Sequence, residues 1–445
     1  MTTLEAKSAF ATGLMRGRIW GILLALAYVG ILHAVYVQMI APTYGYLGFE
    51  YRNPDVLNYV TVIVGVVVLG SLMPRTFDRP SVVVLWLHFL VATAPSMLVP
   101  QYTPVIDPAD AISFGLGVGC MWLVVILLSS RLVAPTRTVS PRRGSAAGWT
   151  ATVVAISIGL DLFLLALLGL RPQLATLTEI SEVRLGYRDA LAGAPAGTAY
   201  LLVGVSNVLN PILMVRGWLT RKLTVVGVGL FGQLVIYSVT GYKTVILSIP
   251  ATLLIVLWLG TRRRADGQRL LQGVVGLMAL AWGAFAILGN SFLAFLFILR
   301  FIVAPGNLAA AYVSIFENQP QLYWSQSVLS WAIEYPYAKS PNFLVGSLFR
   351  GSDITSANVN LFGDGYISMR WAGVLVECLV LVLVLWALDW ASSGVELATS
   401  SVVVMIPTFA LANSNIFTAL TTHGFLLAIL VLMSVPRSDA KGRPG

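Results

Sequence analysis

The stretch "WAGVLVECLVLVLVLWALD", residues 371–389, is an apolar run whose only internal charge is Glu377. As a helix it would rise about 30 Å, which matches the hydrocarbon thickness of a bilayer. A helix also satisfies its own backbone hydrogen bonds, which lipid cannot do. The stretch therefore predicts a transmembrane helix, and with it the class of the whole fold.

Similar runs recur throughout the 445 residues, of which 57% are hydrophobic and 11% are charged. Soluble domains carry about a quarter charged residues, so this composition excludes an ordinary soluble protein. We predict an all-α polytopic membrane protein that forms a single integral membrane domain, residues 1–445. About twelve transmembrane helices are expected, at residues 19–41, 57–74, 81–99, 112–130, 149–170, 197–215, 223–239, 244–260, 270–288, 371–389, 398–412 and 416–435.

The basic residues predict how these spans are oriented. With a cytoplasmic N-terminus, 19 of the 28 lysines and arginines fall in cytoplasmic segments and nine in external ones. Positive charge collects on the cytoplasmic side of membrane proteins, so both termini are predicted to be cytoplasmic. The net charge of +9 is then explained by topology, and no nucleic acid partner is expected.

The external side is where the chain has its long connections. Residues 171–196 are predicted to form external loop 3, and residues 300–370 a large external loop 5 between the ninth and tenth spans. Pro305 and Gly306 are expected to break the helix that ends near Arg300. A structureless loop of this length is unusual in a compact protein, so we expect loop 5 to be partly helical and functional.

Several polar groups in the external segments could bind a ligand. Arg184 and Arg188 would lie on one face of a helix, which suits an anion, although nearby acids could simply neutralise them. Lys243 lies at the tip of a short external turn, where it could contact phosphate or only mark the interface. The glycines around Asp364 could let a ligand approach the backbone, or could form a turn into the tenth span.

Two acids, Asp161 and Glu377, fall inside predicted spans, where an ionised carboxylate costs about 2.5–3.5 kcal/mol. They could couple transport to an ion, or could hydrogen-bond to a neighbouring helix. The three histidines, His33, His88 and His423, lack metal-ligand spacing and are interpreted as packing residues. The sequence contains no nucleotide-binding or hydrolase motif of the usual kinds. No metal site is predicted.

Three stretches carry a family resemblance: "TGYKT" (240–244), "LRFIVAPGNLAAAYVSIFENQPQLYWSQS" (299–327), and "PNFLVGSLFRG" with "SANVNLFGDGYISMRWAGVLVE" (341–351 and 356–377). Together they resemble the O-antigen polymerase (Wzy-type) family of oligosaccharide repeat-unit polymerases. The resemblance implies a glycosyltransferase in the cytoplasmic membrane of a bacterium, with its active site on the external face. Such an enzyme transfers a glycan from undecaprenyl pyrophosphate to the terminal hydroxyl of another lipid-linked repeat unit, without cofactor, metal or nucleotide.

The resemblance also implies roles for particular residues. The departing pyrophosphate would be bound by the basic residues of the external segments, because positive charge stabilises the charge that develops there: Arg184, Arg188, Lys243, Arg300 and Arg350. Glu334 or Asp364 would accept the proton of the acceptor hydroxyl. Tyr187, Tyr312 and Tyr366 would contact sugars. The implied partners are lipid-linked oligosaccharides, membrane lipid, and the flippase and chain-length regulator proteins of the same process.

Three other functions are weighed against this one. An O-antigen ligase would share the fold, but it is expected to have a histidine in the long loop, and residues 300–370 contain none. A glycolipid flippase or transporter would place its charges deep within helices, whereas most charges here lie outside the spans. A transferase that uses lipid-phosphate sugars would need two adjacent acids in the first external loop. That loop has Glu50 and Asp55, which are not adjacent. A polymerase is therefore favoured.

Overall fold

The computed structural model describes residues 3–131, 145–169, 186–187, 189–195, 197–261, 266–351, 353 and 355–437. Over these residues the chain is helical and contains no strand. Ten of the helices are long and apolar enough to cross a membrane. The predicted class, an all-α polytopic membrane protein, is confirmed at this level. The number of crossings and the orientation remain predictions.

The ten candidate spans are Ile19–Leu47, Pro80–Tyr102, Pro108–Ser130, Ala146–Leu168, Thr198–Leu219, Leu223–Thr240, Gly267–Leu288, Ala294–Phe316, Leu361–Ser392 and Ile416–Ser434. Three shorter apolar helices are Val56–Leu72, Lys243–Leu259 and Leu397–Asn413. Every predicted span has a counterpart among these helices. Ala294–Phe316 has no predicted counterpart, because most of it falls in the segment assigned to external loop 5.

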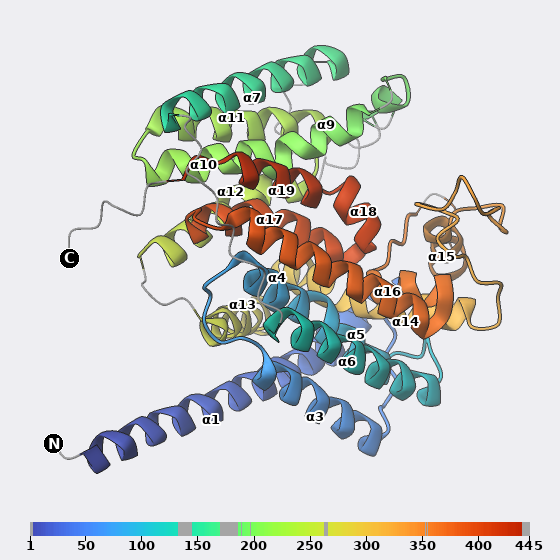
Figure 1. The fold of residues 1–445 in the computed structure, drawn as a ribbon. Helices are drawn as coiled ribbons and strands as arrows, with labels where there is room; N and C mark the ends of the chain where they lie inside the picture. The colour runs from blue at the N-terminus through green and yellow to red at the C-terminus, as the bar shows by residue number, and fades with distance from the viewer. Residues whose placement is uncertain are drawn as a thin grey trace.

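The helices form two groups with a third between them (Figure 1). One group consists of α7 (Ala146–Leu168), α9 (Thr198–Gly204), α10 (Asn210–Leu219), α11 (Leu223–Thr240) and α12 (Lys243–Thr261). The other consists of α1 (Thr3–Val35), α3 (Val56–Leu72), α4 (Pro80–His88), α5 (Ala94–Tyr102), α6 (Pro108–Arg131) and α13 (Gly267–Leu288). Between them lie α16 (Leu361–Ser392), α17 (Leu397–Ala410) and α19 (Phe425–Ser434). The central helices therefore join both groups into one bundle.

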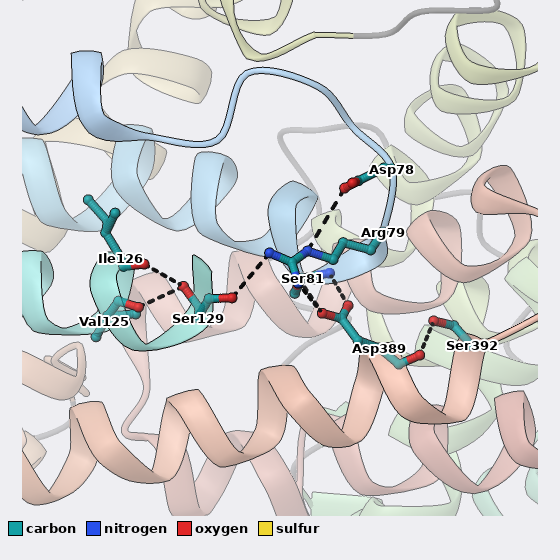
Figure 2. A network of polar contacts seen from close by, with 8 residues as sticks. All are labelled: Asp78, Arg79, Ser81, Val125, Ile126, Ser129, Asp389 and Ser392. Atoms are coloured by element: carbon teal, nitrogen blue, oxygen red, sulfur yellow. Dashed lines mark hydrogen bonds and ion pairs between the residues drawn. The ribbon is translucent and has the colours of Figure 1, made fainter. Parts of the chain in front are cut away.

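The two ends of the bundle differ. At one end, α1 begins and α19 ends, whereas α15 (Pro341–Arg350) and the irregular chain before it lie at the other end (Figure 1). Figure 2 shows polar contacts at the first end, where Arg79 lies 3.6 Å from Asp389 and donates to the Ser129 carbonyl. Among the described residues, the long non-helical chain of residues 317–340 lies at the opposite end.

Prolines shape four of the helices. Each π-helical segment, η1 (Tyr36–Ile40), η3 (Phe89–Thr93), η4 (Val205–Leu209) and η5 (Ala294–Val303), is followed by an α-helical segment with proline as its second residue. Proline lacks an N–H, and its ring clashes with the carbonyl four residues earlier. A wider π-helical turn before the proline relieves this clash while the helix continues.

This geometry explains why the expected break at Pro305 is not present. The helix runs through η5 into α14 (Ala304–Phe316), so irregular chain begins after Phe316 and not near residue 300. Gly306 allows α14 to pack closely on α5, because a Cβ atom there would collide with the Pro95 carbonyl group. Pro305 and Gly306 therefore shape a helix and its packing.

Candidate functional site

Helix α16 is two helical arms joined by a sharp turn. Met369 and Arg370 have non-helical backbone angles, which separate residues 361–368 from residues 371–392. The arms fold back on each other and pack closely. A Cβ atom on Gly365 would lie 2.7 Å from the Val374 backbone, and one on Gly373 would collide with the Gly365 carbonyl. The predicted span began at residue 371, which is where the second arm starts. The polar residues before it form the first arm.

Asn360 fixes the start of the first arm inside the bundle. Its Oδ1 accepts hydrogen bonds from the N–H groups of Phe362 and Gly363, and caps the helix. Its Nδ2 donates to Ser96 Oγ over 3.0 Å and to the Pro305 carbonyl over 3.3 Å. Asn360 is fully buried. Protein surrounds this non-helical start of the arm. We call residues 355–377, which turn back at Met369 and Arg370, the re-entrant hairpin.

Two carboxyl groups meet between the arms. Asp364 on the first arm and Glu377 on the second are 7% and 0% exposed, respectively. The two side chains lie close enough for a hydrogen bond when one of them carries a proton, and we call them the carboxyl pair. Trp324 Nε1 donates to Glu377 Oε1 over 3.1 Å, and the Ile416 N–H, at the start of α18 (Ile416–Thr421), donates to Oε2 over 3.2 Å. Three separate segments therefore converge on Glu377.

Asp364 is held by polar side chains of the neighbouring segments. Gln326 Nε2 donates to Asp364 Oδ1 over 3.4 Å, and the Asn415 side chain lies beside this carboxyl group. Ser325 Oγ, Gln326 Oε1 and Ser368 Oγ are buried atoms that have no hydrogen-bond partner among the described residues. Buried polar atoms normally have partners. These three buried atoms therefore keep unused hydrogen-bonding capacity.

Backbone strain is concentrated at the same place. Tyr323, Trp324 and Arg370 have φ values of 48°, 53° and 54°, in the left-handed region that non-glycine residues rarely occupy. Such a residue costs about 1–3 kcal/mol and persists only where its surroundings impose it, often at a functional site. Leu322 and Tyr323 donate backbone hydrogen bonds to Ile367 and Ser368. The strained segment is thus tied to the first arm.

Arg370 closes the turn of the hairpin. Its guanidinium group donates to the carbonyls of Phe316 and Glu317, so the turn is fixed to the end of α14. It also lies 5.2 Å from the centroid of the Tyr366 ring, an arrangement typical of a cation–π contact. Tyr366 is half-buried and packs edge to face on Trp371 at 5.5 Å. Tyr366, predicted to contact sugar, therefore lies at the rim of the hairpin.

The other predicted residues differ in their positions. Glu334 is exposed in the irregular segment after α14, whereas Asp364 belongs to the carboxyl pair. Tyr312 is 2% exposed and donates to the Ala357 carbonyl, so its ring has no face open to a sugar in this arrangement. It supports the extended chain before Asn360. Tyr312 is therefore packed in the protein interior, whereas Asp364 lies among polar side chains.

The residues predicted to bind pyrophosphate are only partly described. Arg184 and Arg188 lie outside the described residues, as does the side chain of Arg350 at the end of α15. Arg300 is exposed on η5, with its guanidinium 5.5 Å from the Phe295 ring centroid. Lys243 is the first residue of α12. A shared cationic cluster therefore remains a prediction.

One contact joins two of the predicted segments. Tyr187, from predicted loop 3, is 4% exposed and meets the Tyr242 ring edge to face at 5.4 Å. Tyr242 precedes Lys243 in the "TGYKT" turn. Tyr187 thus lies beside this turn. Because the Tyr187 ring is buried, contact with a sugar would need this packing to open.

The irregular segment between α14 and α15 is stabilised by contacts of its own. Lys339 Nζ lies 2.8 Å from Asp353 Oδ1, and this hydrogen bond lowers the pKa of Asp353. The Tyr335 hydroxyl donates to the Lys339 carbonyl, and burial raises the pKa of Tyr335 to about 12. The segment that supplies Trp324 and Gln326 is therefore an ordered part of the structure.

Asp161, His33 and His88, which lie in the spans, make contacts between helices. Asn210 Nδ2 donates to Asp161 Oδ1 over 3.5 Å, which favours a hydrogen-bonding role for Asp161. His33 is hydrogen-bonded to Tyr59, and His88 stacks on Trp122. Within the described ranges, no three His, Cys, Asp or Glu residues lie close enough together to hold a metal ion.

Sequence reasoning considered Glu377 as a lone acid and did not single out Asn360, Trp324 or Asn415. Glu377 had a visible signal, as the one charge inside the apolar run of residues 371–388. No sequence pattern indicated that Glu377 pairs with Asp364, because the pairing depends on the turn of the chain at Arg370. Comparisons of the chain with protein-family models, with curated proteins and with solved structures found no match.

Proposed function

We propose that this chain is a glycosyltransferase that polymerises lipid-linked oligosaccharide repeat units at the outer face of a bacterial cytoplasmic membrane. Its donor would be a glycan on undecaprenyl pyrophosphate, and its acceptor the terminal sugar hydroxyl of another lipid-linked repeat unit. One observation carries the proposal: Asp364, a candidate base in the sequence, is buried in a carboxyl pair among strained backbone and unpartnered hydroxyl groups.

The proposed reaction needs a base and a stabilised leaving group. Asp364 would take the proton of the acceptor hydroxyl while that oxygen attacks C1 of the donor sugar. The bond between C1 and the pyrophosphate oxygen then breaks, and undecaprenyl pyrophosphate leaves with the bonding electrons. Gln326 contacts Asp364, Ser325 precedes Gln326 in the chain, and Ser368 follows Asp364 by about one helical turn. Their unpartnered polar atoms could orient the acceptor.

The leaving group would be stabilised by the external basic residues. Each charge-assisted hydrogen bond is worth about 1.5–3 kcal/mol. Two such bonds would lower the barrier by about 3–6 kcal/mol, which corresponds to between about a hundredfold and ten-thousandfold in rate. The family resemblance implies functional arginines in both larger external loops, which here are Arg184 and Arg188 in loop 3 and Arg300 and Arg350 in loop 5.

A proton-coupled glycolipid transporter is the second candidate, and the carboxyl pair is the observation that favours it. Buried acids in a membrane bundle often carry protons between two sides. The two functions differ in the leaflet where substrate accumulates. Without a polymerase, single lipid-linked repeat units collect on the outer leaflet, whereas without a flippase they collect on the inner leaflet.

The experiment is to delete the gene, follow the location and length of lipid-linked glycans, and restore the gene with variants. We expect the wild-type gene to restore long chains, and Asp364→Asn, Arg300→Ala and Arg350→Ala to leave single units. Asp353→Asn and Lys339→Ala, which change an exposed ion pair of the same segment, are the matched controls. Normal chain lengths in Asp364→Asn at equal membrane abundance would overturn the proposed role of Asp364, and accumulation on the inner leaflet would favour the transporter.

A further inference from the structure

The hydrogen bonds around the carboxyl pair leave one buried carboxyl oxygen without a donor among the described residues. Both oxygens of Glu377 already accept hydrogen bonds from N–H groups. Asp364 Oδ2 is buried and receives no hydrogen bond from any N–H or hydroxyl donor among the described residues. Two ionised carboxylates offer only acceptors. The contact between them is therefore a hydrogen bond only when one of the two groups carries a proton.

The charges around the pair lead to the same conclusion. The segments packed against it contribute Trp324 and Gln326 from the irregular chain, and Asn415 and the Ile416 N–H from the start of α18. The titratable neighbours are Tyr312 on α14 and Cys378 on α16. None of these groups is a cation, and the Arg370 guanidinium donates to the carbonyls of residues 316 and 317. Two negative charges in contact without a neighbouring cation are strongly disfavoured.

We propose that Glu377 is a positioning residue that shares one proton with Asp364, so that the base of the reaction is the buried pair and not a single carboxylate. This inference rests on the proposed function. At rest the pair holds one proton and one negative charge. The acceptor hydroxyl then gives its proton to Asp364, its oxygen bonds to C1, and the pyrophosphate oxygen leaves C1. The neutral pair returns one proton to water before the next cycle.

The arrangement of Glu377 fits this role. The Trp324 indole and the Ile416 N–H fix the Glu377 carboxyl group, so the oxygen that meets Asp364 cannot turn away. The shared proton in turn holds Asp364 on the inner side of the first arm. Loss of this proton at high pH would place two charges in contact and push the arms of the hairpin apart. Interacting carboxyl groups titrate in two macroscopic steps, so chain extension should fall at both low and high pH.

The first test is spectroscopic and does not depend on activity. Infrared spectra of the purified protein in lipid nanodiscs would be recorded against pH in H₂O and D₂O. The wild-type protein should show a protonated carboxyl band at neutral pH that shifts on deuteration, and the band should be lost in both Asp364→Asn and Glu377→Gln. Asp353→Asn, which changes an exposed acid, should keep the band. A wild-type protein without the band would overturn the inference.

The second test measures the pH profile of chain extension with purified lipid-linked repeat units. Glu377→Gln should extend chains at least tenfold more slowly and should lose the fall in rate at high pH, because an amide cannot be deprotonated there. A merely structural Glu377 would leave the shape of the profile unchanged in the folded variant, and that result would overturn the inference. If the wild-type protein extends no chains but keeps the infrared band, the proposed function fails while the shared proton stands.

Discussion

Trp324 and Glu377 are joined by a hydrogen bond from the indole Nε1 to Oε1, 3.1 Å long. The bond links the irregular chain after α14 to the second arm of α16. Trp324 makes it from a left-handed backbone conformation, with φ of 53°. The backbone strain is thus compensated by a hydrogen bond to a carboxyl group that the rest of the site surrounds.

The first prediction removes this hydrogen bond. Trp324→Phe keeps an aromatic ring but loses the donor, and a hydrogen bond to a charged group is worth about 1.5–3 kcal/mol. We expect a lower thermal unfolding temperature of the purified protein and chain extension about tenfold slower. Trp331→Phe is the control, because Trp331 is 83% exposed and donates only to the Val328 carbonyl. Equal effects of the two variants would show that the Trp324 bond has no special role.

The second prediction concerns the anchor of the re-entrant hairpin. Asn360→Ala removes the helix cap and both bonds to Ser96 and Pro305, so the buried backbone N–H groups of the first arm lose their acceptor. Loss of a cap alone costs about 0.5–2 kcal/mol, and unsatisfied buried groups add to this. We expect a smaller amount of folded Asn360→Ala protein in membranes. We also expect added protease to cleave the hairpin of this variant.

Asn358→Ala is the matched control for this prediction. Asn358 is exposed two residues away, and its side chain accepts only from Ser356 Oγ among the bonds described. The unfolding temperature of the Asn358→Ala variant should stay close to the wild-type value, because a surface substitution of this kind changes the free energy of unfolding little. A stable Asn360→Ala variant with wild-type protease resistance would contradict the buried position of this side chain.

The third prediction tests the close contact of the two arms. A Cβ atom at Gly373 would collide with the Gly365 carbonyl, so Gly373→Ala must push the arms apart and separate Asp364 from Glu377. Chain extension and the protonated carboxyl band should both be lost. Gly276→Ala, within α13, meets no atom within 4 Å and should be tolerated. An active Gly373→Ala variant would argue against the hairpin.

The sequence predicted most of the helices because apolar runs of membrane length have one main interpretation. It could not predict that Ala294–Phe316 is a continuous helix. Pro305 and Gly306 usually end helices, and a proline does not by itself show whether a helix breaks or continues through a π-helical segment such as η5. The expected start of irregular chain near Arg300 therefore came from a rule that tertiary packing overrides.

The candidate site was predictable only in part. Asp364 was chosen because it is an acid between glycines in a polar stretch, where the glycines could admit a ligand or form a turn. The structure adds a further role, since Gly365 and Gly373 let the two arms approach each other. Glu377 and Trp324 are 53 residues apart in the chain, and no spacing rule connects residues across an irregular segment and a hairpin.

The last prediction concerns the opposite end of α16 and separates stability from activity. Asp389 accepts hydrogen bonds from the N–H and the hydroxyl of Ser81, at the N-terminus of α4, over 3.1 and 2.7 Å (Figure 2). A carboxylate is favoured there by the exposed N–H groups and the helix dipole. Arg79 lies 3.6 Å from the same carboxylate, and its own side chain is only 21% exposed.

Asp389→Asn would leave Arg79 without its main counter-charge and weaken both bonds from Ser81. We expect a loss of about 1–3 kcal/mol, seen as a lower thermal unfolding temperature. Asp78→Asn is the control, since Asp78 is 71% exposed and 3.9 Å from Arg79, and such surface pairs contribute little. Glu377 precedes Asp389 by 12 residues on the second arm of α16, which is about 18 Å along the helix axis. Chain extension per folded molecule should therefore stay at the wild-type rate. A variant that is as stable as wild-type but inactive would mean that this end of α16 takes part in the reaction.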